Sequence, residues 1–534
     1  MNEEAARIRD RLAELQTERI VLESRLAVLR QMDVSARLAT SSRVVAAKVT
    51  ASSSVHEKLA LFRRLFVGRP DIVPVRWENL RTGRAGYAPA CANEWAKGLC
   101  RKPAVKCGEC PHQAFLAPSD EMLVRHLGGN GSRRASSGSG FVMGVYPLLA
   151  DETCQLLAVD FDDERWADDA LAFLDTCQLE EVPAALERSR SGRGGHVWLF
   201  FAAPLAAREA RRLGAYLITR TTERRPEIGF ASYDRMFPSQ DTMPAGGFGN
   251  LIALPLQWSA RAQGNSVFVD RDLRPYEDQW AFLSSVKPMD PVSVTARVLD
   301  VEAGGLFGGI RLPVEDEDAD EPWRMPPSRI RQLSPVTGPL PRTLHVVLAD
   351  QVYVDRTHLP PAMVVRLVRL AAFQNPEFYR AQAMRLSTFG KPRVISCAEL
   401  HPRHVALPRG CLDEVRTLLG SHGIGVVTED QCSDGTPLPS GVCFRGALDA
   451  QQTLAFDDLA AHDTGVLAAT TAFGKTVVAA ALVAHRARNT LILVHRRELL
   501  SQWVERLRAF LSVEPGGIGV IGGSASRPGK LMSR

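Results

Sequence analysis

The sequence lacks any uninterrupted apolar run of about 18 residues, the length that a membrane-spanning helix needs. Its first ten residues, MNEEAARIRD, are charged and contain no apolar stretch of the kind found in a signal peptide. Lysine is scarce as well, because only nine of the 65 basic residues are lysines. We therefore expect a cytoplasmic protein with no membrane partner, and a lysine within a motif is more informative here than an arginine.

What is present is typical of a globular protein. The chain has 534 residues, of which 45% are hydrophobic and 23% charged, and this composition excludes a disordered or collagen-like chain. At roughly 150 residues per domain, the length predicts three or four domains. A net charge of +5 permits a polyanionic partner such as nucleic acid but does not require one.

Changes in composition divide the chain into six segments, and we expect an α/β and α+β multidomain fold. Heptad spacing of Leu and Ile near the start predicts a coiled coil that forms a homodimer, although a single amphipathic helix explains the pattern equally well. An acidic, proline-rich tract predicts a linker. The expected segments are the coiled coil (1–35), a zinc-binding part (56–135) and catalytic core (136–286) of one unit, the linker (287–342), a small α/β domain (343–440) and a partial P-loop domain (441–534).

Four of the ten cysteines lie close together, with the spacing C-x8-C-x6-C-x2-C. The final Cys-x2-Cys step is the strongest signal, since it places two thiolates on one turn, as tetrahedral zinc sites require. We predict a structural Zn²⁺ ion bound by Cys91, Cys100, Cys107 and Cys110, with His112 as a possible replacement for one of them. The alternative is a group of reduced, buried cysteines.

Two carboxylates end an apolar strand in LLAVDFDDERW. Asp160 and Asp162 are two residues apart and therefore lie on one face of a strand, where their oxygens suit a divalent cation. A solvated strand end or a helix cap would explain the same pattern, so other residues must converge on it.

A loop rich in Gly, Ser and Arg, SRSGRGG, then leads into a strand that begins at His196. Glycines let backbone amides approach a phosphate, and Arg and His supply donors. A third carboxylate follows, Asp234 after Tyr233, with Asp241 as a rival. The candidate phosphate-binding residues of the loop are Ser191, Arg193, Gly194 and Gly195.

These three pieces, in this order, resemble the archaeo-eukaryotic primase superfamily, whose hallmark is a strand with D-x-D or D-x-E, a small-x-His motif and a later hydrophobic-Asp. They read here as Asp160-Phe161-Asp162, Gly194-Gly195-His196 and Tyr233-Asp234. The stretches ACANEW, CGEC, ERSRSGRGGHVWLFF, SYDRMFPSQD and GGFGNLIALPLQ extend the resemblance to the primase domain of TOTE conflict systems, over about residues 56–286. That family is implicated in conflict between mobile elements, viruses and hosts, and its primase is coupled to a superfamily 2 helicase.

The resemblance implies an RRM-like palm in which Asp160, Asp162 and Asp234 bind two Mg²⁺ or Mn²⁺ ions. It also implies that His196 contacts the phosphates of the incoming nucleotide while a 3′-hydroxyl attacks the α-phosphate. Ser191, Arg193 and Arg235 are candidate contacts to phosphate or template. The expected function is a DNA primase-polymerase, with DNA and nucleoside triphosphates as partners.

The last segment contains a P-loop. In GVLAATTAFGKTVVAAALVAH an expected strand, a loop ending in Gly474-Lys475-Thr476 and a helix follow one another, as ATP binding requires. Lys475 is the only lysine between Lys391 and Lys530. LDAQQTLA, with Gln452, and NTLILVHRRELLSQW, an expected strand and helix start, resemble elements of DEAD/DEAH-type superfamily 2 helicases.

No acidic box and no second RecA-like lobe follow this P-loop before residue 534. We therefore expect that this chain alone neither hydrolyses ATP efficiently nor unwinds DNA, and a separate polypeptide that carries the rest of the motor is one explanation. A catalytically weak nucleic-acid-binding or regulatory protein is the main alternative function. A glycosyltransferase with a D-x-D sugar-nucleotide site is disfavoured by the small-x-His strand.

Overall fold

The computed structural model describes residues 48–79, 81–102, 104–128, 140–228, 235–244, 246–303, 336, 338–514, 516–522 and 525–527. The predicted coiled coil (1–35) and Asp234 lie outside these residues. The chain forms two units: Met1–Pro341 with Arg356–Pro402 is unit 1, and Arg342–Asp355 with Arg403–Arg534 is unit 2. No helix within the described ranges is both long and apolar enough to cross a membrane.

Unit 1 is built on an antiparallel sheet with the strand order β7-β4-β6-β5-β9. Along β4, Leu157 and Val159 belong to the apolar cluster on one face, whereas Leu156 and Ala158 belong to the cluster on the other. The strand is apolar on both faces because both faces of the sheet are covered. The strands are β4 (Thr153–Phe161), β5 (Ala185–Arg188), β6 (Gly195–Ala206), β7 (Met236–Phe237) and β9 (Val267–Phe268).

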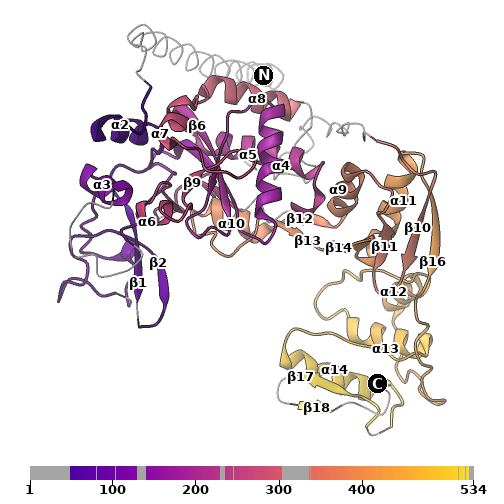
Figure 1. Ribbon diagram of the computed structural model, residues 1–534. Coiled ribbons are helices and arrows are strands. Elements are labelled where there is room, and N and C mark those ends of the chain that lie inside the picture. Colours follow the sequence, from indigo (N-terminus) through magenta and orange to yellow (C-terminus); the bar gives the residue numbers. More distant parts are fainter. Residues whose placement is uncertain are drawn as a thin grey trace, which may run out of the picture. The chain divides into compact units, whose positions relative to one another are not determined.

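Helices α4 (Trp166–Leu179), α5 (Ala207–Thr222) and α8 (Pro291–Ala303) pack on one face of this sheet (Figure 1). The first part of the segment expected to be a linker (287–342) is thus α8, because Val294 and Val298 are apolar, four residues apart and buried in the core. The acidic composition of the later part of the segment concealed this helix.

The other face of the sheet is covered by shorter elements that share a second core: α2 (Val55–Leu65), α3 (Asp120–Gly128), α7 (Gln279–Ser285) and the pair of β3 (Gly144–Val145) with β8 (Ile252–Ala253). Helix α2 begins with a capping box, in which Ser54 and Glu57 each bond to the other's backbone N–H. Around this core lie the hairpin of β1 (Pro74–Asn79) and β2 (Arg84–Pro89), η1 (Cys107–Glu109) and α6 (Trp258–Arg261). The short turn η2 (Pro226–Ile228) instead contacts α5, on the opposite face of the sheet.

Unit 1 also contains part of the segment for which the sequence predicted one small α/β domain (343–440). Buried polar contacts hold this part to the loop that follows β7, including a hydrogen bond of 2.8 Å from Gln240 to Thr388. The middle of the expected domain therefore belongs to unit 1. Its elements are α9 (Pro361–Leu370), β12 (Ala372–Gln374), α10 (Pro376–Ala383), β13 (Val394–Ser396) and β14 (Glu399–Leu400).

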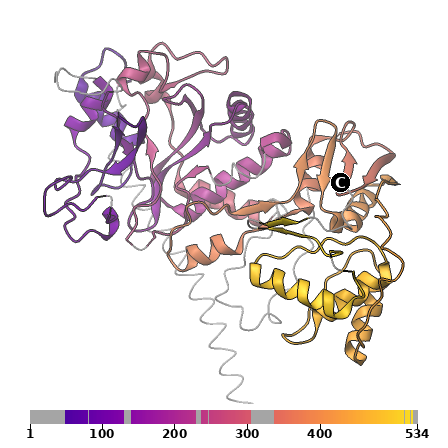
Figure 2. The same ribbon diagram turned by 90° about the horizontal axis from the view of Figure 1, so that it is seen from below.

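Unit 2 starts with a sheet in which β10 (Thr343–Leu348) is parallel to β16 (Gly425–Asp430) and antiparallel to β11 (Val352–Asp355), which pairs with β15 (His404–Leu407). η6 (Arg409–Cys411) leads into α11 (Leu412–Ser421), whose Val415 and Leu419 are buried. The P-loop part, with its helices drawn in yellow in Figure 2, contains α12 (Ala450–Ala460), α13 (Lys475–Arg486), α14 (Arg497–Phe510) and the pair of β17 (Val520–Gly522) with β18 (Ala525–Arg527).

Two strands expected in the P-loop part are not formed. Residues 465–470 and 491–494 have no regular secondary structure, and Val466 and Leu493 are 92% and 84% exposed. The sequence prediction of these strands was wrong because an apolar run becomes a strand only where a neighbouring strand pairs with it. Within the described part of the chain, neither segment has such a neighbour.

Candidate functional site

Three ionisable side chains form a row across three adjacent strands of unit 1. His196 on β6 lies directly opposite Asp160 on β4 and Glu187 on β5. His196 Nδ1 is 2.9 Å from Glu187 Oε2, and its Nε2 is 3.5 Å from Asp160 Oδ1. The residues lie on the face that does not carry α4 and α5, since they alternate with Val159 and Val197, which pack under those helices.

The electrostatics of the row favour a charged histidine. Burial by itself would lower the pKa of His196, but the charge of Glu187, its hydrogen bond and the charge of Asp160 outweigh burial, so the pKa is raised. The pKa of Asp160 is also raised, chiefly by burial, against the opposing charges of His196 and Arg235. The row therefore holds a proton donor beside a carboxylate.

Glu187 is the site residue that the sequence analysis missed. It is only 1% exposed, and its Oε2 also accepts a hydrogen bond of 2.8 Å from Trp198 Nε1. A charged residue this deeply buried needs partners, and His196 and Trp198 supply them. The signal available in the sequence was the pattern ALER, where a glutamate occupies an inward-facing position of an apolar strand.

Asp162 lies one residue beyond the end of β4. Its side chain is 58% exposed and forms an ion pair with Arg235. The backbone N–H of Asp160 donates to Arg235 O at 2.9 Å, so Arg235 is fixed next to both carboxylates. The structure thus brings Asp160, Asp162 and His196 to one end of the sheet. Their donors suit Mg²⁺ or Mn²⁺, provided that Arg235 releases Asp162.

The loop from Ser189 to Gly194 is closed by backbone and hydroxyl contacts beside this row. The N–H of Ser189 donates to Gly194 O at 2.8 Å, and Ser191 Oγ lies 3.1 Å from Ser189 Oγ and accepts from Arg193 N at 3.2 Å. Ser191 and Arg193 therefore lie within a defined turn next to His196.

The two glycines before His196 have a steric role. A Cβ atom on Gly194 would lie 2.8 Å from the carbonyl oxygen of Phe161, and one on Gly195 would lie 2.8 Å from the ring of Trp166. Both positions therefore require glycine for the loop to pack against β4 and α4, whatever the loop binds.

Asp241, the rival for the third carboxylate, is already neutralised by arginine. Its Oδ1 is 2.5 Å from Arg211 Nη1, and Gln382 donates to its Oδ2 at 3.2 Å. Burial works against the charged form, but Arg211 and Arg393 nevertheless lower the pKa of Asp241. This carboxylate stabilises the loop after β7, and its oxygens are committed to these partners.

The four cysteines and His112 are brought together, since all five line one small cavity of about 20 Å³. The four thiols are reduced and half-buried. Backbone N–H groups of Lys102 and Trp95 lower the pKa of Cys100, which favours the thiolate that zinc needs. Even so, within the described residues no group of three or more His, Cys, Asp or Glu side chains is arranged to hold a metal ion, here or at the carboxylates.

The P-loop of unit 2 has the loop and the helix that its sequence predicted, although the strand expected before them is not formed. Gly474 adopts a φ of +88° and precedes α13, which starts at Lys475. Lys475 Nζ donates to Ala469 O and Thr470 O at 2.7 and 2.9 Å, so its ammonium group lies within the curve of the loop. Gln452 donates to Phe473 O at 2.8 Å and thus joins α12 to the loop.

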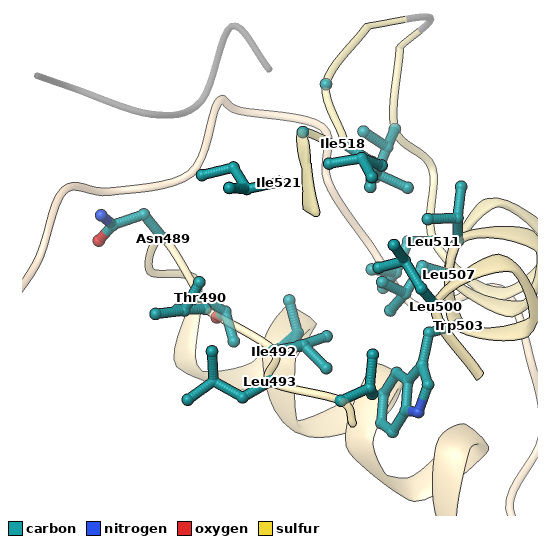
Figure 3. A pocket seen from close by; sticks show the side chains of 18 of the residues that line it. Asn489, Thr490, Ile492, Leu493, Leu500, Trp503, Leu507, Leu511, Ile518 and Ile521 are labelled. Atoms are coloured by element: carbon teal, nitrogen blue, oxygen red, sulfur yellow. The ribbon is translucent and has the colours of Figure 1, made fainter. Parts of the chain in front are cut away.

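Unit 2 also has an apolar cavity of about 480 Å³ between segment 491–494 and α14. Figure 3 shows Ile492 and Leu493 on one side, with Leu500, Trp503 and Leu507 on the helix opposite. Such a lining suits neither a phosphate nor a metal ion, so this cavity is not a candidate nucleotide site.

Unit 1 is thus an α/β domain in which two aspartates and a histidine lie at one end of the sheet. Unit 2 contains a P-loop segment. Residues 57–296 match the family model described as TOTE conflict system, Archaeo-Eukaryotic Primase domain, and residues 446–527 match Type III restriction enzyme, res subunit. The chain therefore joins a TOTE-type primase domain to a helicase-type segment, which confirms the resemblance found in the sequence. No curated protein matches the chain.

Proposed function

We propose that unit 1 is a metal-dependent nucleotidyltransferase, a DNA primase-polymerase of a conflict or mobile-element system. The observation that carries this proposal is the meeting of Asp160, Asp162 and His196 at one end of a sheet, within a segment similar to TOTE primase domains. The chain order β4-α4-β5-β6-α5-β7 and the sheet order β7-β4-β6-β5 support the RRM-like palm expected from the resemblance.

In this proposal Asp160, Asp162 and Asp234 hold the metal ions. When bound, these ions would supply activation of an attacking 3′-hydroxyl and charge stabilisation of a leaving pyrophosphate. His196 is held by Glu187 with its Nε2 directed to the Asp160 side, from where a protonated ring donates to a phosphate oxygen. Ser191, Arg193, Gly194 and Gly195 are the proposed phosphate-binding part of the loop.

Two further ligands are part of the proposal. A structural Zn²⁺ ion would bind Cys91, Cys100, Cys107 and Cys110, supported by the cavity that all four thiols line. ATP would bind in unit 2 at Gly474, Lys475 and Thr476, with Gln452 beside the loop.

The test is template-dependent nucleotide incorporation with Mg²⁺ or Mn²⁺. The double variant Asp160→Ala/Asp162→Ala should lose at least about a hundredfold in rate, because metal ions contribute several kcal/mol of charge stabilisation. Glu164→Ala, an exposed carboxylate nearby, is the matched control and should keep full activity. Incorporation that persists in the double variant would rule the proposal out.

The ion pair of Arg235 with Asp162 favours one alternative, a catalytically weak nucleic-acid-binding or regulatory protein in which an arginine occupies the metal position. Mn²⁺ binding measured by electron paramagnetic resonance separates the two functions. A nucleotidyltransferase should bind Mn²⁺ in the wild-type chain and lose it in the double variant. The alternative predicts no difference between them.

A further inference from the structure

A large cavity of about 1190 Å³ opens on unit 1 between three segments that are distant in the sequence. One wall is the turn Cys107–Glu109, the second is the glycine-rich loop after β7, and the third is residues 385–392. The third wall lies outside the part of the chain that matches the primase family model, which ends at residue 296. The volume exceeds the range of ~300–1,000 Å³ that is usual for a drug-sized ligand, and this favours a polymer as occupant.

Buried polar contacts fix the third wall to the second. Gln240 donates to Thr388 at 2.8 Å, and Arg393 donates to Ser239 O at 2.6 Å while its guanidinium group stacks 4.3 Å above the ring of Phe378. Since the first hydrogen bond is buried and the second is partly buried, residues 385–392 keep a defined position relative to β7. The cavity is therefore a built feature of unit 1.

The lining has the chemistry of a single-stranded nucleic-acid site. Lys106, Arg385 and Lys391 supply positive charge, and Phe389 is an aromatic ring that is 96% exposed. Arg385 pairs with Glu152 at 2.8 Å and Lys391 with Glu377 at 3.4 Å, but both cations lie at the surface, where such pairs are weak and phosphates compete with them. Exposed rings next to basic side chains are the standard means of binding single strands, because every base can stack on a ring.

The cavity also adjoins the candidate catalytic row. Phe237, in its lining, pairs across the sheet with Ala158, two residues before Asp160. Tyr87, also in the lining, interacts with Arg190 of the loop and with the charge of Glu187, while burial raises its pKa. A strand in this cavity would thus lead directly to the nucleotidyl-transfer site.

We infer that this cavity binds the single-stranded DNA template and that residues 385–392 form its outer wall, with Phe389 stacking on a base and Lys391 contacting a phosphate. The inference rests on the proposed primase-polymerase function for the identity of the strand. It assigns a DNA-binding role to a segment beyond the primase domain.

The experiment measures binding of fluorescently labelled oligo-dT to the full chain by anisotropy, with no Mg²⁺, Mn²⁺ or nucleotide added. Phe389→Ala should weaken binding about tenfold through the loss of one stacked base. Phe389→Tyr should bind like wild type, since the ring is kept. Lys391→Ala should weaken binding and reduce the dependence of log K on log salt by about 0.7, the value for one phosphate of a single strand.

Matched controls are Phe373→Ala and Arg224→Ala, which change exposed residues of unit 1 outside the cavity. Both should bind as wild type does. Oligo-dT carrying 4-thiothymidine should also form its photo-crosslink in unit 1 within residues 376–392. The inference would be overturned if both cavity variants kept the wild-type affinity or if the controls lost as much affinity as they do. It would also be overturned by a crosslink confined to other peptides, or by an effect of the substitutions on oligo-U alone.

The same measurements separate this inference from the proposed function. The variant Asp160→Ala/Asp162→Ala should bind oligo-dT at least as tightly as wild type, since its changes remove no cavity residue and take away two negative charges next to it. If the wild-type chain incorporates no nucleotide while the cavity variants still lose affinity for oligo-dT, the proposed polymerase function is wrong and the proposed binding site is supported. If incorporation depends on the two aspartates while the cavity variants bind normally, the binding site fails alone.

Discussion

Glu187 illustrates how one residue can determine the behaviour of a site without contacting its substrate. Its carboxylate fixes His196 at Nδ1 and accepts from Trp198, so Nε2 of His196 is directed to the side of Asp160. A histidine whose ring orientation is set by a carboxylate is a common arrangement, and losing such a supporting partner typically costs about 10- to 100-fold in affinity or activity.

We predict that Glu187→Gln lowers the rate of nucleotide incorporation about 10- to 100-fold, the usual effect of removing an orienting partner. The amide keeps the volume and an acceptor for Trp198, so the fold should persist. Steady-state kinetics are the measurement, with kcat and the KM for nucleotide determined separately. Because Glu187 acts through His196, the double variant Glu187→Gln/His196→Ala should be no slower than His196→Ala alone. Additive losses would contradict this positioning role.

His126 makes the stability of unit 1 dependent on pH. It is fully buried between Pro255 O at 3.1 Å and the backbone N–H of Met143 at 3.2 Å, and burial lowers its pKa from 6.5 to about 4. The unfolded chain therefore binds the proton more tightly than the folded chain does. The stability that neutral His126 contributes is fully present above pH 6.5 and is lost as the pH falls towards 4.

The measurement is urea unfolding of the wild type and His126→Gln between pH 7 and pH 4. The wild type should lose up to about 3 kcal/mol more than the variant over this range, at 1.36 kcal/mol per pKa unit. His56→Gln, which removes an exposed histidine, is the control and should follow the wild type. Parallel curves for wild type and His126→Gln would show that His126 does not titrate on unfolding.

At the scale of elements, substitutions in α8 can test whether this helix, which the sequence analysis assigned to a linker, packs on the core. Val298, on the side of α8 that faces the sheet, is 3% exposed, whereas its neighbour Leu299 is 58% exposed. Val298→Ala should lower the free energy of unfolding by about 1–3 kcal/mol, from lost burial and a residual cavity. Leu299→Ala should change it by less than about 0.5 kcal/mol. Equal effects in urea unfolding would mean that α8 does not pack on the sheet in solution.

The elements also show what the sequence could predict. The apolar strand that ends in Asp160-Phe161-Asp162 and the strand that starts at His196 were predicted correctly, because their signals are local. Pairing across strands is not local, so Glu187 was missed although it stands next to His196 in the sheet. For the same reason the strand expected at 491–494 was wrong, since strand formation depends on a partner elsewhere in the chain.

At the scale of the whole molecule, two nucleotide sites are proposed in two separate units. Asp160 and His196 belong to unit 1, and Lys475 belongs to unit 2. The division was only partly predictable, because residues 356–402 join unit 1 through contacts such as Gln240 with Thr388, which no local pattern reveals. Sites on separate cores should be separable by mutation, since changes at positions without shared partners are additive.

We therefore predict that Lys475→Ala weakens ATP binding by about 1.5–3 kcal/mol, the contribution of a hydrogen bond to a charged group, and leaves nucleotide incorporation unchanged. Asp160→Ala/Asp162→Ala should have the opposite pattern. The measurements are isothermal titration with a non-hydrolysable ATP analogue and template-dependent incorporation, with the exposed Arg506→Ala as the control in unit 2. If Lys475→Ala slowed incorporation while Arg506→Ala did not, the P-loop and the primase site would be coupled, and two independent sites would no longer describe the chain.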